Sequence, residues 1–168
     1  MRMQRIILST ATAALLLASI AGSAQERGSA AQAEHQHSNI AQFDDTRAAI
    51  ALTEIERAFI KREMRGLLES VRDMLLASST GDRAAIAAAG RRAGMNGPEK
   101  DHIPPSLAPK LPLEFKKLGL GTHRAFDQIA LEVEKGGDTA AVPKRLGELM
   151  GNCIACHSTW RVVDEATR

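Results

Sequence analysis

Apolar side chains recur at steps of three and four residues through a long stretch after Thr46, and this pattern constrains the fold more than any other feature. Its members are Leu52, Ile55, Phe59, Ile60, Met64, Leu67, Leu68, Val71, Met74 and Leu75. Such spacing is typical of an α-helix that buries one side. Thr53 and Glu56 have the spacing of a capping box, although Asp44 or Asp45 would also allow an earlier start. The sequence therefore predicts a long first helix that Gly81 ends.

Three further helical segments are expected along the rest of the chain. A short, alanine-rich helix should run from Asp82 to about Met95, and a third should begin near Leu113. The last helix is expected over Thr139–Val163, because Pro143 falls in its first turn, where proline is tolerated. The third helix should end at the glycine pair 136–137.

Glycine and proline residues indicate where the predicted helices are interrupted. The stretch from Asn96 to about Leu111 is rich in proline and is expected to be irregular, with His102 exposed in it. Gly119 and Gly121 could separate a short first piece from the third helix.

Composition favours helices over sheets. The 168 residues are 44% hydrophobic, which suffices for one domain with a core, but only 3% are aromatic and none is tyrosine. An all-β sandwich or barrel draws on aromatic and β-branched residues, so this class is disfavoured. The sequence predicts an all-α domain over residues 46–168, built as an antiparallel four-helix bundle.

The N-terminus has the organisation of an export signal. Arg2 and Arg5 precede an apolar run over residues 6–21, and small residues then offer a cleavage site before Gln25. The run is shorter than the roughly 20 residues of a membrane span. We therefore predict a signal peptide over residues 1–24, a flexible lead-in over residues 25–45, and a mature periplasmic protein with no membrane segment.

The charge balance argues against a nucleic-acid partner. Loss of residues 1–24 removes two of the 22 Lys and Arg and none of the 20 Asp and Glu, so the mature chain is formally neutral. Its basic residues are interspersed with acidic ones, and no long basic stripe could replace the counterions of a phosphate backbone.

The two cysteines of the chain stand together as Cys153, Ile154, Ala155, Cys156 and His157. This C-x-x-C-H spacing is the one used for covalent haem attachment: two thiols one helical turn apart can each bond a haem vinyl group, and the adjacent imidazole can bind the iron. The surrounding apolar stripe is expected to turn the motif towards the interior. It comprises Leu146, Leu149, Met150, Cys153, Cys156, His157 and Trp160.

Three other uses of the cysteines fit less well. A thioredoxin-like dithiol follows a strand in a βαβ unit, which this chain does not predict. Zinc needs two more ligands, and His35 and His37 in the lead-in are poor candidates. A disulfide across two residues closes too small a loop to stabilise much.

The segment CIACHSTWR near the C-terminus resembles the class II c-type cytochromes, the cytochrome c′ and cytochrome c-556 family. In that family the motif lies on the last of four helices, and an arginine follows the ligand histidine by four residues, as Arg161 does here. The resemblance implies one covalent haem c held by Cys153 and Cys156, with His157 as proximal ligand and Arg161 beside the haem. Trp160 stands where the family more often has tyrosine or phenylalanine.

The resemblance implies one of two functions, and they differ in whether a side chain occupies the sixth coordination position of the haem iron. In the six-coordinate members a methionine of the first helix fills it, and helix phase aligns Met64 with that residue; His123 is a rival. This arrangement suits an electron carrier that meets redox partner proteins and can form a homodimer. An open sixth position would instead bind small gases such as nitric oxide. We expect no enzyme, because no catalytic constellation is recognisable.

Overall fold

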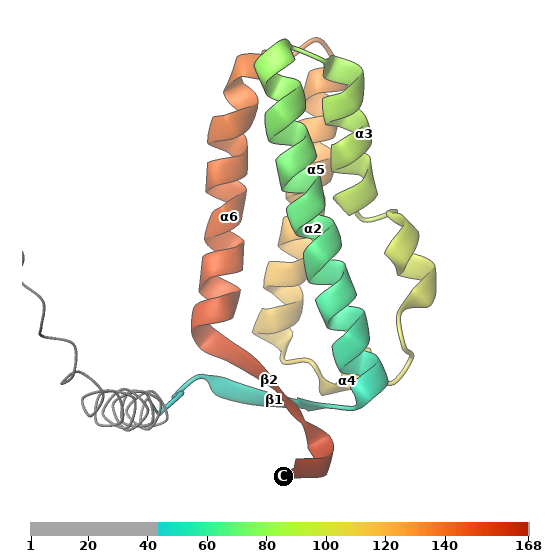
Figure 1. The fold of residues 1–168 in the computed structure, drawn as a ribbon, viewed down its shortest axis with the longest axis vertical. Coiled ribbons are helices and arrows are strands. Elements are labelled where there is room, and N and C mark those ends of the chain that lie inside the picture. The colour runs from blue at the N-terminus through green and yellow to red at the C-terminus, as the bar shows by residue number, and fades with distance from the viewer. Residues whose placement is uncertain (1–43, 168) are drawn as a thin grey trace, which may run out of the picture. The chain divides into compact units, whose positions relative to one another are not determined.

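A computed structural model describes residues 44–167, and the unit that begins at Thr46 is the one discussed here (Figure 1). The expected signal peptide and nearly all of the lead-in, with His35 and His37, lie outside the described residues. The elements in chain order are β1 Ala48–Leu52, α2 Glu54–Thr80, α3 Arg83–Ala93, a 3₁₀ turn Pro98–His102, α4 Leu107–Lys110, α5 Leu113–Glu134, a 3₁₀ turn Thr139–Ala141, α6 Val142–Thr159, β2 Trp160–Asp164 and a 3₁₀ turn Glu165–Thr167.

The unit is mostly helical with one small two-stranded sheet. Strands β1 and β2 pair in parallel, with Ala48 opposite Trp160 and Leu52 opposite Asp164. Helices α2 and α6 lie alongside each other on one side of the unit, and α3 lies on the other side of α2 (Figure 1). The expected all-α class is therefore broadly confirmed, and the small sheet is the one feature of the fold class that the sequence did not predict.

Local signals set the ends of α2 and α3 as expected. Thr53 caps α2 in a capping box: its hydroxyl accepts from the Glu56 amide, and the Glu56 carboxylate accepts from the Thr53 amide. Gly81 ends the helix in the left-handed conformation, with φ of 71°, which glycine adopts without strain. Asp82 then caps α3 through the Ala85 amide.

Two alternatives that the sequence left open do not occur, and one expected boundary was wrong. An earlier start of the first helix at Asp44 or Asp45 does not occur, because residues 48–52 form β1. Helix α5 is continuous through Gly119 and Gly121, since tertiary packing outweighs the modest helix cost of glycine. Helix α6 ends at Thr159 and not at Val163, because the chain continues as β2.

The buried apolar side chains form two separate clusters. The first joins α2, α3, α5 and α6 and contains Met74, Ala77, Ile86, Ala89, Ala93, Phe126, Ile129, Val133, Val142, Leu146 and Leu149. The second lies beside the sheet and contains Ile50, Leu52, Phe59 and Leu107. The long helices extend from one cluster towards the other. Each long helix therefore has a stretch whose side chains belong to neither cluster.

A buried carboxylate fastens the N-terminal end of α2 to the chain around α4. Glu56 is only 1% exposed. Its Oε1 accepts from Ser106 Oγ at 2.7 Å and its Oε2 accepts from Lys110 Nζ at 2.8 Å, while Lys110 also binds Glu165 at 2.6 Å. The Lys110 and Ser106 donors lower the pKa of the Glu56 carboxyl from 4.5 to about 2.

This carboxyl should make the stability of the fold depend on acid. Because folding lowers the pKa of Glu56, its contribution is complete above pH 4.5 and is lost as the pH falls towards about 2. We expect the melting temperature of Glu56→Gln to be lower than wild type at pH 7 and to fall less between pH 4.5 and 2, as followed by circular dichroism. Glu54→Gln, which changes an exposed carboxylate two residues away, should keep the wild-type slope; an equal slope for Glu56→Gln would contradict the prediction.

Candidate functional site

The C-x-x-C-H motif lies in the last two turns of α6. Cys153 and Cys156 are free and half-buried, and His157 is exposed. Burial raises the pKa of both thiols, and for Cys156 the neighbouring Cys153 adds to the effect. Redox-active dithiols have a lowered thiol pKa, so these surroundings do not favour the thioredoxin-like use.

The motif spans the gap between the two apolar clusters. Cys153 packs against the edge of the first cluster, and Trp160 packs against the edge of the second. Cys156 and His157 lie between them and belong to neither. The Cys156 thiol and the His157 imidazole therefore lie at the level of the gap between the two apolar clusters.

The part of α5 at this level contains two glycines, Gly119 and Gly121. A Cβ added to Gly121 would lie 3.6 Å from the Asn152 side-chain amide of α6, so the two helices approach each other closely here. A Cβ added to Gly119 would meet no atom within 4 Å.

Met64 lies on the side of α2 that faces away from α3. Asp73 of α2 binds Arg92 of α3 at 2.5 Å, and Met64 is nine residues, or two and a half turns, before Asp73. The two side chains therefore leave α2 in opposite directions. Helix α2 packs against both α3 and α6, so the flank that carries Met64, turned away from α3, is the one nearer α6.

The motif histidine lies on the side of α6 that faces α2. Arg145 binds Glu132 of α5 at 2.8 Å, and Ile154 is nine residues further along α6, on the opposite side. Met150 and His157 share the Ile154 side, because they are four residues before and three after it. His157 and Met64 thus lie on the sides of α6 and α2 that flank the same seam.

Met64 and the C-x-x-C-H motif also lie at the same distance from the end of the unit at which α2 and α6 meet. The far ends of the two helices meet where a Cβ on Gly81 would be 3.8 Å from Thr139 Oγ1. Met64 precedes Gly81 by 17 residues and Cys156 follows Thr139 by 17 residues, which is about 26 Å along each helix. Antiparallel helices therefore bring Met64 level with Cys156 and His157.

The expected burial of the stripe around Met64 was only partly correct. Phe59 and Met74 are buried, but Met64 is 38% exposed and Leu68 is 69% exposed. On α6, Leu146 and Leu149 are buried, whereas Met150 is exposed. The apolar side chains of α2 extend around more of the helix than its neighbouring helices cover. Those on one flank of α2, including Met64 and Leu68, therefore remain exposed.

His123, the rival to Met64, has both ring nitrogens engaged elsewhere. Its Nδ1 is 2.7 Å from the Ala93 carbonyl oxygen, and its Nε2 is 3.5 Å from Glu63 Oε1. Burial raises the pKa of the Glu63 carboxyl, and Glu63 Oε2 has no hydrogen-bond partner in the part of the chain that the structure describes. Ala93 is the last residue of α3 and Glu63 is the residue of α2 before Met64, so both nitrogens of His123 already face protein partners on these two helices.

Arg161 is not placed as the sequence predicted. It was expected one helical turn beyond His157 and on the same helical face, but it lies in β2, where successive side chains alternate between two faces. Its Nε donates to the Arg47 carbonyl at 3.3 Å, while Arg47 Nη1 donates to the His157 carbonyl at 3.0 Å. The two arginines therefore link the end of α6 to the chain before β1, and sequence analysis gave no sign of Arg47.

Loss of the Arg161 guanidinium should loosen this link. We expect Arg161→Ala to lower the free energy of unfolding by about 1 kcal/mol, the usual contribution of such a hydrogen bond. Urea unfolding of the haem-loaded protein would measure it, with Arg161→Lys as the variant that keeps a donor. An unchanged unfolding midpoint would contradict the structural role, and a shifted reduction potential would support the additional position beside the haem that the resemblance implies.

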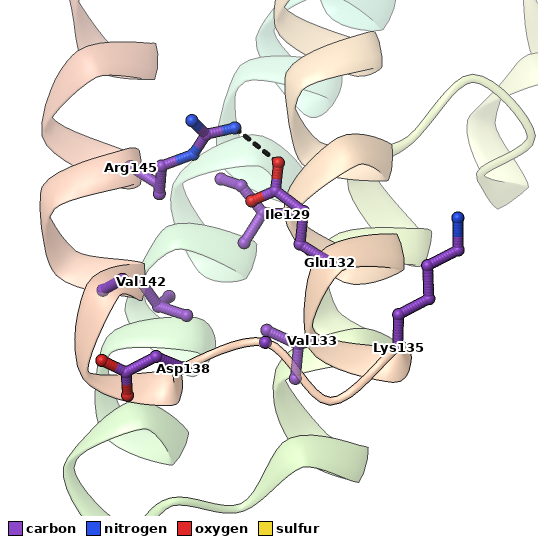
Figure 2. A pocket seen from close by; sticks show the side chains of 9 residues that line it. Ile129, Glu132, Val133, Lys135, Asp138, Val142 and Arg145 are labelled. Carbon is purple, nitrogen blue, oxygen red and sulfur yellow. Dashed lines mark hydrogen bonds and ion pairs between the residues drawn. The ribbon is translucent and has the colours of Figure 1, made fainter.

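A cavity of about 370 Å³ lies at the other end of α5 and α6 (Figure 2). Ile129, Val133 and Val142 point into it, and the Glu132–Arg145 ion pair crosses its mouth. Cys153 is eight residues beyond Arg145, about 12 Å along α6. This cavity is therefore separate from the motif.

No three His, Cys, Asp or Glu side chains of residues 44–167 gather in a way that could hold a metal ion. Within the same range no helix is long and apolar enough to cross a membrane.

Comparison of the whole chain with family models, with curated proteins and with solved structures found no match. A functional conclusion must therefore rest on the motif and on its surroundings.

Proposed function

We propose that this protein is a periplasmic class II c-type cytochrome that carries single electrons. Its four longer helices would form the antiparallel bundle of that family. One haem c would be bonded to Cys153 and Cys156, with His157 as proximal ligand and Met64 as distal ligand. The export signal expected over residues 1–24 agrees with this location, because covalent haem attachment by such a motif serves exported proteins.

The observation that carries this proposal is the place of the motif in the fold. Two thiols one turn apart and an adjacent imidazole lie where the apolar core is interrupted, on a helix that ends beside the second cluster. A haem needs two accessible thiols and an imidazole, which the motif supplies, and apolar contacts, which the two clusters on either side of the motif would supply. A structural disulfide or a dithiol enzyme would need none of the apolar surroundings.

The proposed distal ligand rests on a second observation. Met64 is level with Cys156, on the side of α2 that flanks the seam to α6, and no other thioether of residues 44–167 shares both properties. Met74 is fully buried in the first cluster, and Met150 lies on the same helix as His157, so neither can approach the opposite side of the iron. Both ring nitrogens of His123 already face protein partners, the Ala93 carbonyl of α3 and the Glu63 carboxylate of α2.

When bound, the haem supplies an iron that changes between the ferric and ferrous states. The protein would provide the fixed ligands and the apolar surroundings that let this change occur with little rearrangement. Thioether ligation favours the ferrous state and raises the reduction potential, which suits an electron carrier. The last turn of α6, which carries His157, is held by Arg47 and by the strand pairing that follows it.

Absorption spectra of the oxidised and reduced protein, matured in cells that attach haem, test the proposal directly. We expect a c-type spectrum that is low-spin in both oxidation states. A protein without haem would contradict the proposal. A five-coordinate ferrous protein that binds carbon monoxide or nitric oxide would instead favour the gas-binding function, with Met64 as a surface side chain, in agreement with its 38% exposure.

A further inference from the structure

The seam between α2 and α6 is flanked by exposed apolar side chains, which we name the α2–α6 face. It consists of Leu68 and Leu75 on α2 and Met150 and Ile154 on α6. Leu68 and Ile154 are 69% and 66% exposed. Scattered apolar residues are common on protein surfaces, but four along one seam, beside the proposed haem, form a patch of the kind used for protein contact.

Uncompensated positive charge borders this face on α2. Lys61 and Arg65 are exposed, one turn apart, and follow the same flank of the helix as Leu68. Neither has an acidic partner among residues 44–167. On α6 the segment from Leu149 to Thr159 contains no Asp, Glu, Lys or Arg. The face therefore has an apolar centre and a positive border, with no acidic side chain from α6 to neutralise it.

We propose that the α2–α6 face docks a redox partner protein that offers an apolar patch bordered by carboxylates. This inference rests on the proposed function, because the face adjoins the level of Met64, Cys156 and His157, where electrons would enter and leave. Opposite charges on the two proteins accelerate their encounter and select the orientation, while the apolar centre excludes water.

A second copy of the chain fits this face less well. In a two-fold symmetric dimer the same surface meets itself, so Lys61 and Arg65 of one copy would approach the same cations of the other. Like charges placed together across an interface are unfavourable. An acidic partner removes this repulsion, and the charges of the α2–α6 face therefore favour a different protein.

Electrodes coated with alkanethiols of known end group provide a defined partner surface. The haem-loaded full chain should exchange electrons rapidly at low ionic strength on a mixed carboxylate and methyl coating, and about tenfold more slowly on an amine coating. Lys61→Glu with Arg65→Glu should lose this preference. Arg124→Glu with Lys135→Glu makes the same change of charge on exposed residues of α5 and its C-terminal end, and should keep it.

The apolar centre is tested separately. Leu68→Gln with Ile154→Gln should slow exchange on the mixed coating and leave exchange on a pure carboxylate coating unchanged. Equal rates on all coatings, or an equal loss in the α5 control, would overturn the proposal. A wild-type dimer that Leu68→Asp converts to a monomer would overturn it in favour of a second copy.

A redox titration in solution with small mediators separates this inference from the proposed function. The titration reports the haem potential without any docking surface. If the titration detects no haem redox couple, the proposed cytochrome function is rejected. If it detects one but the electron-exchange rate does not depend on the electrode coating, only the proposed docking partner is rejected.

Discussion

Replacement of Cys153 and Cys156 together by alanine should abolish covalent haem and leave little folded protein. Wild type matured in cells that attach haem should carry one haem that resists extraction by acidified organic solvent. The double variant should have the mass of the bare chain. Its folding should fail because the two apolar clusters are separate at the level of the motif, and the haem would supply the apolar contact between them.

Mass spectrometry and circular dichroism measure the two parts of this prediction. His157→Ala is the matched control, since it keeps both thiols and removes only the proximal ligand. It should retain covalent haem but show an altered spectrum. A double-cysteine variant that remains as stable as wild type would show that the cysteines have no cofactor role, and freely extractable haem in wild type would reject covalent attachment.

Met64→Ala should convert the haem from low-spin to high-spin and create a binding site for carbon monoxide or nitric oxide. The thioether is the sixth ligand in the proposed arrangement, so its loss opens the iron. The reduction potential should fall as well, because thioether ligation favours the ferrous state. Absorption and resonance Raman spectra of both oxidation states would measure the change of spin.

Met150→Ala is the control for this experiment. Met150 is also exposed and also borders the α2–α6 seam, but it lies on the helix of His157 and cannot reach the opposite side of the iron. Its loss should leave the spectrum unchanged. If Met64→Ala is also silent and wild type already binds these gases, Met64 is not a ligand.

The sequence determined the parts of this protein that depend on neighbouring residues. Thr53, Glu56, Gly81 and Asp82 act on amides or carbonyls within a few positions of themselves, so they fixed the ends of α2 and α3 without help from the rest of the chain. The C-x-x-C-H motif is local too. One helical turn sets the spacing of its thiols, whatever the surroundings.

The tertiary structure alone decided the features that join distant parts of the chain. Strand β1 forms because it pairs with β2, more than 100 residues away, and a parallel pair leaves no local sign in either strand. That pairing ended α6 at Thr159 and moved Arg161 off the helical face on which it was expected. Helical periodicity predicted which side of α2 is apolar. It did not predict which of those apolar side chains are buried, because burial depends on where α3 and α6 pack against α2. The exposure of Met64 and Leu68, and hence the α2–α6 face, follows from that packing.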